Sequence, residues 1–332
     1  MPVNRTRTPQ IMRIAMLGVS HWHAGMHADA ARAAGATLAA VWDADAAIAT
    51  AFAAGEGGHA AATAGDALAE HPDFVVVLGT GPGAAALLGD VLTHDVAVLV
   101  DKPLGLMAPD VAALAAEAAR RNRFVAVPLA NRCGPMLDAV AARRNAGTLG
   151  IITNMQYRLI NGPAQRYRDW GVGWMLDPAC SGGGALRNLG VHGMDAFLAI
   201  AGTQAVSVAH AAFRRDDAGS AVETYALVVL RAADGMLGVV EAGYTHADPR
   251  GGDYEWRIDA PGASLADDGE TLHVATPAGP NQTLPGVAKG GRYRAFMADT
   301  LARQATGRPP AVSLDDFARA STLVDAAYAW ER

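Results

Sequence analysis

The sequence predicts an α/β N-terminal domain with a doubly wound parallel sheet of the Rossmann type, followed by an α+β domain with a large, mostly antiparallel sheet. The chain has 332 residues, which exceeds the size at which one hydrophobic core usually stops growing. Up to about residue 130, short apolar runs alternate with alanine-rich helical segments, and after Arg144 polar and apolar residues alternate within the runs. We therefore expect a disordered leader over 1–10, a first domain over 11–130 and a second domain over 131–332.

Five apolar runs in the first half predict the strands of the parallel sheet. Each run is short and is followed by turn or helix-start residues; they span 12–18, 37–43, 74–79, 96–101 and 124–129. Such uniformly apolar strands are typical of a sheet that helices cover on both faces. Ligands bind these sheets at the carboxyl ends of the strands, so we expect the site in the crevice beside the second domain.

The second half has a different pattern. Strand-like runs lie at 150–160, 205–213, 222–230, 236–244, 254–260 and 271–275. Their alternation predicts an antiparallel sheet with one face packed on helices. A Gly-rich turn and a helix are expected over 182–201, and two closing helices over about 291–306 and 315–331.

Composition excludes several classes of partner. The net charge is −6 and no run of Lys or Arg is long enough to follow a phosphate backbone, so no nucleic acid is expected. No apolar run is long enough to cross a membrane. Cys133 and Cys180 form no disulfide or zinc pattern, and the polar leader does not resemble a signal peptide; a cytoplasmic location is therefore predicted.

The loop after the first strand is the expected position of a bound pyrophosphate. Gly18 follows a strand and precedes a helical pattern, so backbone amides and a helix N-terminus can hold phosphate oxygens. The usual Gly-x-Gly-x-x-Gly/Ala pattern is altered, because Ser20 and His23 occupy two of its positions. Ser20 is small and can bind a phosphate, whereas an imidazole at 23 needs space between helix and strand.

Asp43 ends the second strand and gives the stronger indication of a dinucleotide. A carboxylate there accepts hydrogen bonds from a ribose diol and repels a 2′-phosphate, which favours NAD over NADP. The alternative role for Asp43 is the N-cap of the following helix.

The histidines of this loop also raise the question of a metal. His23 and His27 are spaced as a chelating pair on a helix. No carboxylate or cysteine completes a ligand set nearby, so no metal site is predicted.

Two further motifs follow the Gly18 loop in the chain. The first is Val-Leu-Val-Asp-Lys-Pro-Leu-Gly at 98–105, and the second is Ser-Gly-Gly-Gly-Ala-Leu-Arg-Asn-Leu-Gly-Val-His-Gly-Met-Asp at 181–195. Together with the Gly18 loop they make the chain resemble the Gfo/Idh/MocA family of oxidoreductases. The segments at 131–135, 147–152 and 308–316 resemble other parts of that family, so the resemblance covers nearly the whole chain. It implies reversible hydride transfer between a nicotinamide cofactor and a hydroxyl carbon, usually of a sugar or polyol.

The resemblance also implies roles for individual residues. Lys102 corresponds to the family lysine beside substrate and nicotinamide ribose, and Asp101 replaces the usual glutamate. His192 corresponds to the histidine that exchanges the hydroxyl proton. The expected catalytic residues are Lys102, His192 and Asn188. The expected cofactor contacts are Gly18, Ser20, His21, Trp22, His23, Asp43, Thr80, Asp101 and Lys102. The expected substrate contacts are Asn131, Tyr157, Arg168, Trp174, Asn188 and His192, and Arg132 and Trp170 are further candidates.

Asn188 departs from the family, which often has an aspartate at this position. An amide can hydrogen-bond His192 but cannot stabilise its imidazolium as a carboxylate would, so Asp195 or Asp177 is a candidate to assist. The leading hypothesis is an NAD(P)-dependent dehydrogenase of a sugar, polyol or related hydroxy compound. The alternatives are an NAD-using lyase or glycosidase on the same fold, and a non-catalytic binding protein with a degraded cofactor site. A homodimer or homotetramer through the apolar second sheet is also expected.

Overall fold

The N-terminal half forms a six-stranded parallel sheet with strand order β3-β2-β1-β4-β5-β6. The computed structural model describes residues 11–216, 220–246 and 253–330, so the predicted leader lies outside the described residues. The strands are β1 Arg13–Leu17, β2 Thr37–Trp42, β3 His59–Ala60, β4 Phe74–Val77, β5 Ala97–Val100 and β6 Val125–Ala126. The helices between them are α1 Ala24–Ala33, α2 Ala46–Glu56, α3 Ala64–Ala69, α4 Gly81–Val91 and α5 Ala108–Arg120. This order is the doubly wound Rossmann topology that the sequence predicts.

The second half forms an eight-stranded sheet with the order β14-β13-β12-β11-β7-β10-β9-β8. Its strands are β7 Asn154–Ile160, β8 Val206–Arg214, β9 Tyr225–Ala232, β10 Leu237–Gly243, β11 Asp253–Ala260, β12 Ala263–Asp267, β13 Thr271–Ala275 and β14 Gln282–Pro285. Every neighbouring pair is antiparallel except β7 and β10, which run parallel. The predicted fold class, including the mostly antiparallel second sheet, is confirmed.

The helical segments of this half are η1 Ala130–Cys133, α6 Pro135–Asn145, α7 Gln165–Asp169, η2 Gly173–Leu176, α8 Pro178–Ser181, η3 Leu186–Gly190, α9 Val191–Ala201, α10 Lys289–Ala305 and α11 Leu314–Trp330. The helix expected after the Gly-rich turn is present, but its first part, η3, is wound as a π-helix. π-Helical turns are rare and often mark functional sites. Among the described residues, none of these helices combines the length and apolarity that crossing a bilayer requires.

Burial patterns explain why the two sheets differ. Every residue of β4 and β5 is buried, because helices cover both faces of the first sheet. In β9, buried residues alternate with partly exposed ones, since only one face packs on helices. The sequence did not predict β3, β12 and β14; β3 has two residues and β14 is exposed throughout, so neither has the apolar pattern that marks a strand.

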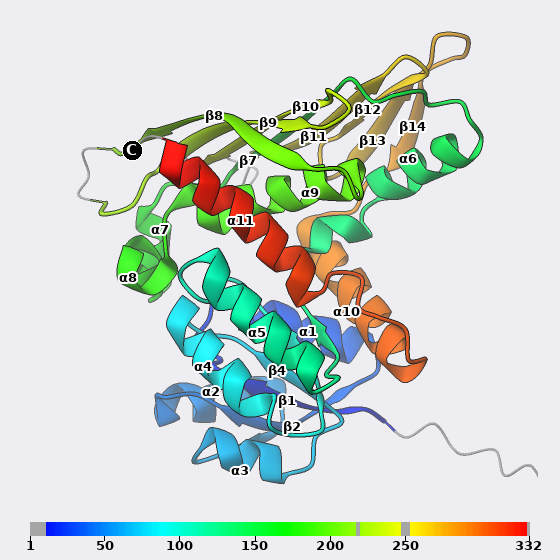
Figure 1. Cartoon of the computed structure of the whole chain (residues 1–332). Helices are drawn as coiled ribbons and strands as arrows, with labels where there is room; N and C mark the ends of the chain where they lie inside the picture. Colours follow the sequence, from blue (N-terminus) through cyan, green and yellow to red (C-terminus); the bar gives the residue numbers. More distant parts are fainter. Residues whose placement is uncertain (1–10, 217–219, 247–252, 331–332) are drawn as a thin grey trace, which may run out of the picture.

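The last two helices return to the first domain and fix the relation between the two halves. α10 packs against α1 and η1, whereas α11 lies diagonally between α5 and α9 (Figure 1). Ser313, between these helices, also pairs with Ala126 of β6. The site therefore lies between domains that several segments hold together.

Candidate active site

A cavity of about 540 Å³ lies where the carboxyl ends of the parallel strands face the second domain. The first domain contributes Trp22, His23 and Lys102. The chain from η1 onward contributes the rest of the wall: Ala130, Asn131, Tyr157, Leu159, Asn161, Arg166, Tyr167, Asn188, Leu189, His192, Asp253, Tyr254, Glu255, Asp268, Gly269, Glu270, Ala288, Lys289, Arg292 and Tyr293. This size and mixed polar and aromatic lining suit a small-molecule ligand.

The loop after β1 retains the geometry of a phosphate cradle despite its altered sequence. Gly18 has φ +83°, and a Cβ there would lie 2.4 Å from the carbonyl oxygen of Leu78 at the end of β4. Only glycine permits this conformation and this approach together. The amide of Trp22 donates no hydrogen bond within the described part of the chain, so it is available to a ligand.

Asp43 closes the other side of this loop. Its carboxylate is buried and accepts the backbone amides of Ser20, at 2.7 Å, and Asp45, at 3.0 Å. The N-cap of α2 is Asp45 rather than Asp43, so the alternative role is wrong. Thr80, another expected cofactor contact, caps α4 through its hydroxyl and lies at the end of β4.

The buried His23 ring is accommodated behind the Gly18 loop because it forms a hydrogen bond with Asp101, a carboxylate distant in sequence. The Asp101 Oδ2 atom lies 2.8 Å from His23 Nδ1 and 2.9 Å from His27 Nε2, and its other oxygen accepts the Lys102 amide. Burial alone would raise the pKa of Asp101, but His23 and His27 hold that pKa well below its usual range. Burial lowers the pKa of His23 well below the usual value. We interpret the arrangement as an ionised Asp101 carboxylate beside a neutral His23 imidazole.

The expectation that no carboxylate stands near these histidines is therefore wrong. His21, His23 and Asp101 offer donor atoms within 4.8 Å of one another. His21 is buried, its Nε2 atom has no partner among the described residues, and burial lowers its pKa to about 3. Its ring stacks on Trp22 with centroids 3.8 Å apart.

Lys102 is buried and held from the second domain. Its Nζ atom donates to Asn188 Oδ1 and lies 5.1 Å from the centre of the Trp22 ring. The Asn188 amide nitrogen donates to the hydroxyls of Tyr167 and Tyr244, both at 2.8 Å. Burial lowers the pKa of Lys102 to about 8; Asp101 opposes this shift and Lys289 adds to it.

His192 lines the cavity without the hydrogen bond expected from Asn188, whose amide is used by Lys102 and the tyrosines. The His192 Nδ1 atom is buried and has no partner among the described residues. Burial, and then the positive charge of Lys102, lower the pKa of His192 to about 3. His192 is therefore a neutral imidazole near pH 7.

Neither carboxylate proposed to assist His192 does so. Asp195 forms a two-pronged ion pair with Arg132, with Nε at 2.9 Å from Oδ2. Asp177 is exposed and caps α8 by accepting the amide of Ala179. Arg132, a further substrate candidate, is thereby occupied in an ion pair.

The expected substrate contacts are only partly brought together. Asn131, Tyr157, Asn188 and His192 line the cavity. Arg168 and Trp174 are not among its lining residues; Arg168 is exposed and donates to Gln165, and Trp174 packs on Trp22 with ring centroids 5.6 Å apart. Trp170 is likewise exposed, beneath the guanidinium of Arg166. Successive side chains of a helix such as α7 are rotated by about 100° around its axis, and the sequence alone did not show which side faces the cavity.

Several lining residues were not predicted, among them Tyr167, Arg166, Lys289, Arg292, Tyr254 and Tyr293. One signal could have identified Lys289. Of the 27 lysine and arginine residues in the chain, only Lys102 and Lys289 are lysines. The tyrosines carried no such signal, because aromatic residues occur equally in cores.

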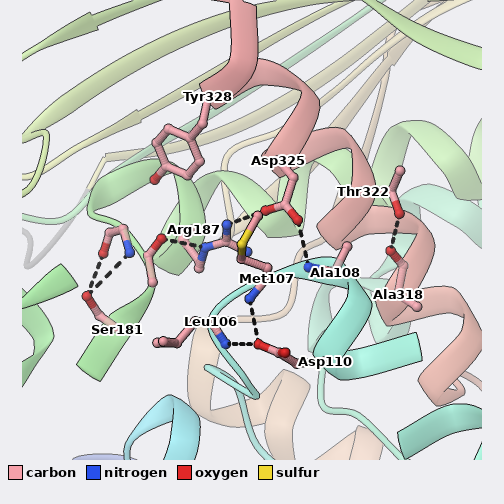
Figure 2. A network of polar contacts seen from close by, with 12 residues as sticks. Leu106, Met107, Ala108, Asp110, Ser181, Arg187, Ala318, Thr322, Asp325 and Tyr328 are labelled. Carbon is pink, nitrogen blue, oxygen red and sulfur yellow. Dashed lines mark hydrogen bonds and ion pairs between the residues drawn. The ribbon is translucent and has the colours of Figure 1, made fainter. Parts of the chain in front are cut away.

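A polar network ties the turn after Lys102 to the helix that carries Asn188 (Figure 2). Asp325 of α11 accepts the amide of Ala108 at 2.6 Å and pairs with Arg187 of η3. Arg187 also donates to the carbonyl oxygen of Gly182 at 3.0 Å. Gly182 has φ +72°, and a Cβ there would lie 2.4 Å from the carbonyl oxygen of Leu106, so the two turns touch through backbone.

Comparison with known proteins agrees with this geometry. Residues 12–129 match a family model described as "Oxidoreductase family, NAD-binding Rossmann fold", and residues 138–265 match the GFO/IDH/MocA C-terminal domain. The chain belongs to the Gfo/Idh/MocA oxidoreductase family. The resemblance inferred from the Gly18 loop, the Asp101-Lys102-Pro103 turn and the 181–195 segment is confirmed, as are the oxidoreductase class and the NAD-binding first domain.

Individual relatives are more distant. The trans-1,2-dihydrobenzene-1,2-diol dehydrogenase of Oryctolagus cuniculus is 30% identical over 173 residues, which are 52% of this chain and 50% of that protein. The chain thus matches about half the length of this relative. GenD2 from gentamicin A biosynthesis, solved with NAD, is 24% identical with a TM-score of 0.81, covering 98% of this chain and 95% of its own. An inositol dehydrogenase homologue from Azotobacter vinelandii, solved with NAD⁺, is 16% identical with a TM-score of 0.83 and 97% coverage of both chains. These two similarities show the fold.

Proposed function

We propose that the protein is an NAD-dependent dehydrogenase or reductase that acts on a CH–OH group of a sugar, polyol or related hydroxy compound. The observation that carries the proposal is the position of Lys102. Its amine extends from the end of a Rossmann strand to Asn188, beside His192, at the cavity between the domains. An amine with a pKa of about 8, enclosed with an imidazole, suits proton exchange with an alcohol.

The residues around the first strand fit a dinucleotide. Gly18 leaves room at the backbone, and the Trp22 amide is available for a phosphate oxygen. The Asp43 carboxylate, already oriented by two amides, has lone pairs left for a ribose diol and would repel a 2′-phosphate, so we propose NAD rather than NADP. The unpartnered His21 Nε2 atom offers a further polar contact.

The proton is assigned to Lys102. A nicotinamide cofactor held by the Gly18 loop and Asp43 would supply the hydride acceptor for oxidation of the carbinol carbon. The neutral Lys102 amine takes the hydroxyl proton, so that a carbonyl compound and an ammonium group remain. Because the pKa of His192 is lowered to about 3, its neutral ring hydrogen-bonds the substrate oxygen and does not hold the proton. This differs from the roles that the family resemblance implies.

In this scheme Asn188 orients the proton acceptor and keeps its pKa low. Its carbonyl oxygen orients the Lys102 amine, and the two tyrosine hydroxyls hold the amide in that orientation. An amide carries no charge, so it leaves the pKa of Lys102 low, whereas an aspartate would raise that pKa.

The lining supports a polyhydroxylated substrate. Tyr157 and Tyr254 offer aromatic faces, and Asn131 and Asn161 offer amides, a combination that suits rings with apolar C–H faces and hydroxyls. The names of two relatives agree with this substrate class. One is a dihydrodiol dehydrogenase, and the other is a homologue of an inositol dehydrogenase.

The test is to incubate the protein with NAD and a panel of cyclic polyols and sugars, and to follow the absorbance of the reduced cofactor. We expect the wild type to turn over at least one compound. Lys102→Ala should lose that turnover, and His192→Ala should show a reduced rate. Turnover that both variants retain unchanged would contradict the proposal. A parallel assay with NADP tests the role of Asp43, for which we expect a lower kcat/KM.

We also propose a homodimer or homotetramer formed through the outer face of the second sheet. Leu227 and Val229 of β9 and Val239 of β10 are partly exposed there, and Leu237 is 41% exposed. A partner subunit would cover these side chains. A single monomer-sized species in light scattering across micromolar concentrations would contradict this. A cytoplasmic location stays a prediction; the thiols of Cys133 and Cys180 are free.

A further inference from the structure

The cavity contains positive charge that the protein does not neutralise. Lys289 begins α10 and lines the cavity, and its exposed side chain has no hydrogen bond or ion pair within the described residues. Arg166 of α7 also lines it; its guanidinium donates to the neutral Asn161 amide and lies 4.3 Å from the centre of the Trp170 ring, with no carboxylate partner among the described residues.

These two cations lie close together and close to the reacting groups. The charges of Asp101 and Arg166 act on Lys289 in opposite directions, and its side chain is exposed at the cavity. Lys289 in turn acts on the pKa of His192 and of Lys102. None of the carboxylates that line the cavity is among the main charges acting on His192.

Those lining carboxylates are largely occupied. Asp253 pairs with Arg158 at 2.8 Å, and Glu255 pairs with Arg257. Asp268 accepts the amides of Glu270 and Thr271. Glu270 remains, and it is exposed. Of the charges that act on His192, Lys102, Lys289 and Arg292 are positive and Asp101, which His23 and His27 bind, is negative, so positive charge predominates there.

The start of α10 adds to this positive field. Its N-cap residue, Ala288, lines the cavity and provides no side-chain cap, and the first turn holds no acidic residue. A helix N-terminus usually carries an acidic group, which offsets the positive end of the helix dipole. Here a lysine followed by Gly290 and Gly291 occupies that turn.

Lysine is also rare in this protein. Among the lysine and arginine residues of the chain, all but two are arginines. Both lysines, Lys102 and Lys289, line the same cavity. Lys102 has a role as a proton acceptor. The side chain of Lys289 is exposed at the cavity and has no hydrogen bond or ion pair among the described residues, so it is available to a ligand there.

We propose that the substrate is anionic: a hydroxy compound that carries a carboxylate or a phosphate, bound by Lys289 and Arg166 while its hydroxyl meets Lys102. This inference rests on the proposed function, because it takes the cavity as the substrate site of that dehydrogenase. It narrows the substrate class from sugars and polyols in general to sugar acids, hydroxy acids or sugar phosphates. Charge-assisted hydrogen bonds to both cations would supply much of the affinity.

The experiment measures binding by calorimetry to the full-length protein saturated with NADH. The probes are a matched set: glucose, glucuronate, glucose 6-phosphate and glucosamine. We expect at least one anionic probe to bind about 10- to 100-fold more tightly than glucose, with a preference that shrinks at high salt. The carboxylate and phosphate arms distinguish the two kinds of anion. Equal or weaker binding of both anions relative to glucose, including no detectable binding of any probe, would overturn the inference.

Variants assign the effect to the two cations. Lys289→Met and Arg166→Met should each reduce the anion preference, measured as the ratio of the affinity for the anion to the affinity for glucose, about tenfold. Arg168→Met, on the same helix as Arg166 but exposed, and Arg294→Met, on α10 but paired with Asp29, are the matched controls and should retain the preference. Preference that survives in both test variants overturns the assignment. Turnover is read separately from NADH absorbance, so a charge preference without any oxidation would contradict the proposed function and not this inference.

Discussion

The two walls of the cavity are built in different ways. On the wall from the first domain, short loops follow fully buried strands, and the polar groups satisfy one another: Asp101 binds His23 and His27, and Lys102 reaches Asn188. On the wall from the second domain, Lys289 and Arg166 stand without carboxylate partners. Under the proposed function, the first wall sets the chemistry through fixed geometry and the second selects the substrate through its charge.

The largest expected effect is the removal of the Lys102 amine. Lys102→Ala should lower kcat by about 10²–10⁴, because it removes the group that accepts the hydroxyl proton. In the wild type, kcat/KM for oxidation should rise with pH through about 8, since only the neutral amine can accept a proton, and the reverse reaction should fall over the same range. Lys102→Arg keeps the charge but not the base, so it should remain inactive. A wild-type profile that is flat between pH 6 and 10 would assign the proton elsewhere.

The next effect tests the fixed geometry of the first wall. Gly18→Ala places a Cβ 2.4 Å from the Leu78 carbonyl oxygen at a positive φ, so we expect a loss of about 1–3 kcal/mol of unfolding free energy. The affinity for NAD should fall about tenfold or more, as measured by calorimetry. Gly25→Ala in α1 is the control, because a Cβ there meets nothing within 4 Å. Equal behaviour of the two variants would show that the loop is not as constrained as described.

Asn188→Asp tests the contact between the two walls, because Asn188 of the second wall accepts a hydrogen bond from Lys102 of the first. A carboxylate beside the Lys102 amine should raise the pKa of that amine, so the midpoint of the pH profile for oxidation should move up by about one unit or more. At pH 7 the rate should fall about tenfold, and it should recover at higher pH. A loss of activity that alkaline pH does not restore would instead indicate that Asn188 acts through packing. Thermal unfolding of the variant separates that outcome from misfolding.

The smallest effect concerns the connection between the walls that Figure 2 shows. Asp325→Ala leaves Arg187 without its carboxylate and the Ala108 amide without its acceptor, at an expected cost of about 1–3 kcal/mol in unfolding free energy. We expect only a two- to fivefold decrease in kcat, because neither residue contacts the cavity. Thr322→Ala on the same helix is the control, since its hydroxyl bonds only to Ala318 of its own helix. A change in the pH profile of Asp325→Ala would show that the network reaches Lys102.

The sequence by itself determined the Rossmann sheet, the antiparallel sheet and the family. It also predicted Gly18, Asp43, Lys102 and Asn188 as site residues, since each follows a strand or a Gly-rich turn, and the structure places Lys102 and Asn188 in the wall of the cavity. Tertiary structure alone decided the partners. Asp101 lies 78 residues from His23 and Asn188 lies 86 residues from Lys102. Pairs so far apart meet only through the packing of whole domains, and no local pattern encodes that.

The same reason explains the errors. Asp195 lies one turn from His192 on the helix but pairs with Arg132, because helical spacing shows which residues share a face and not what packs against it. Lys289 carried no motif, and only the return of α10 to the first domain brings it to the cavity. Strand and loop patterns thus indicated where chemistry could occur, whereas burial and long-range contacts decided the shifted pKa values of Lys102 and His192 and left Lys289 and Arg166 without a carboxylate partner among the described residues.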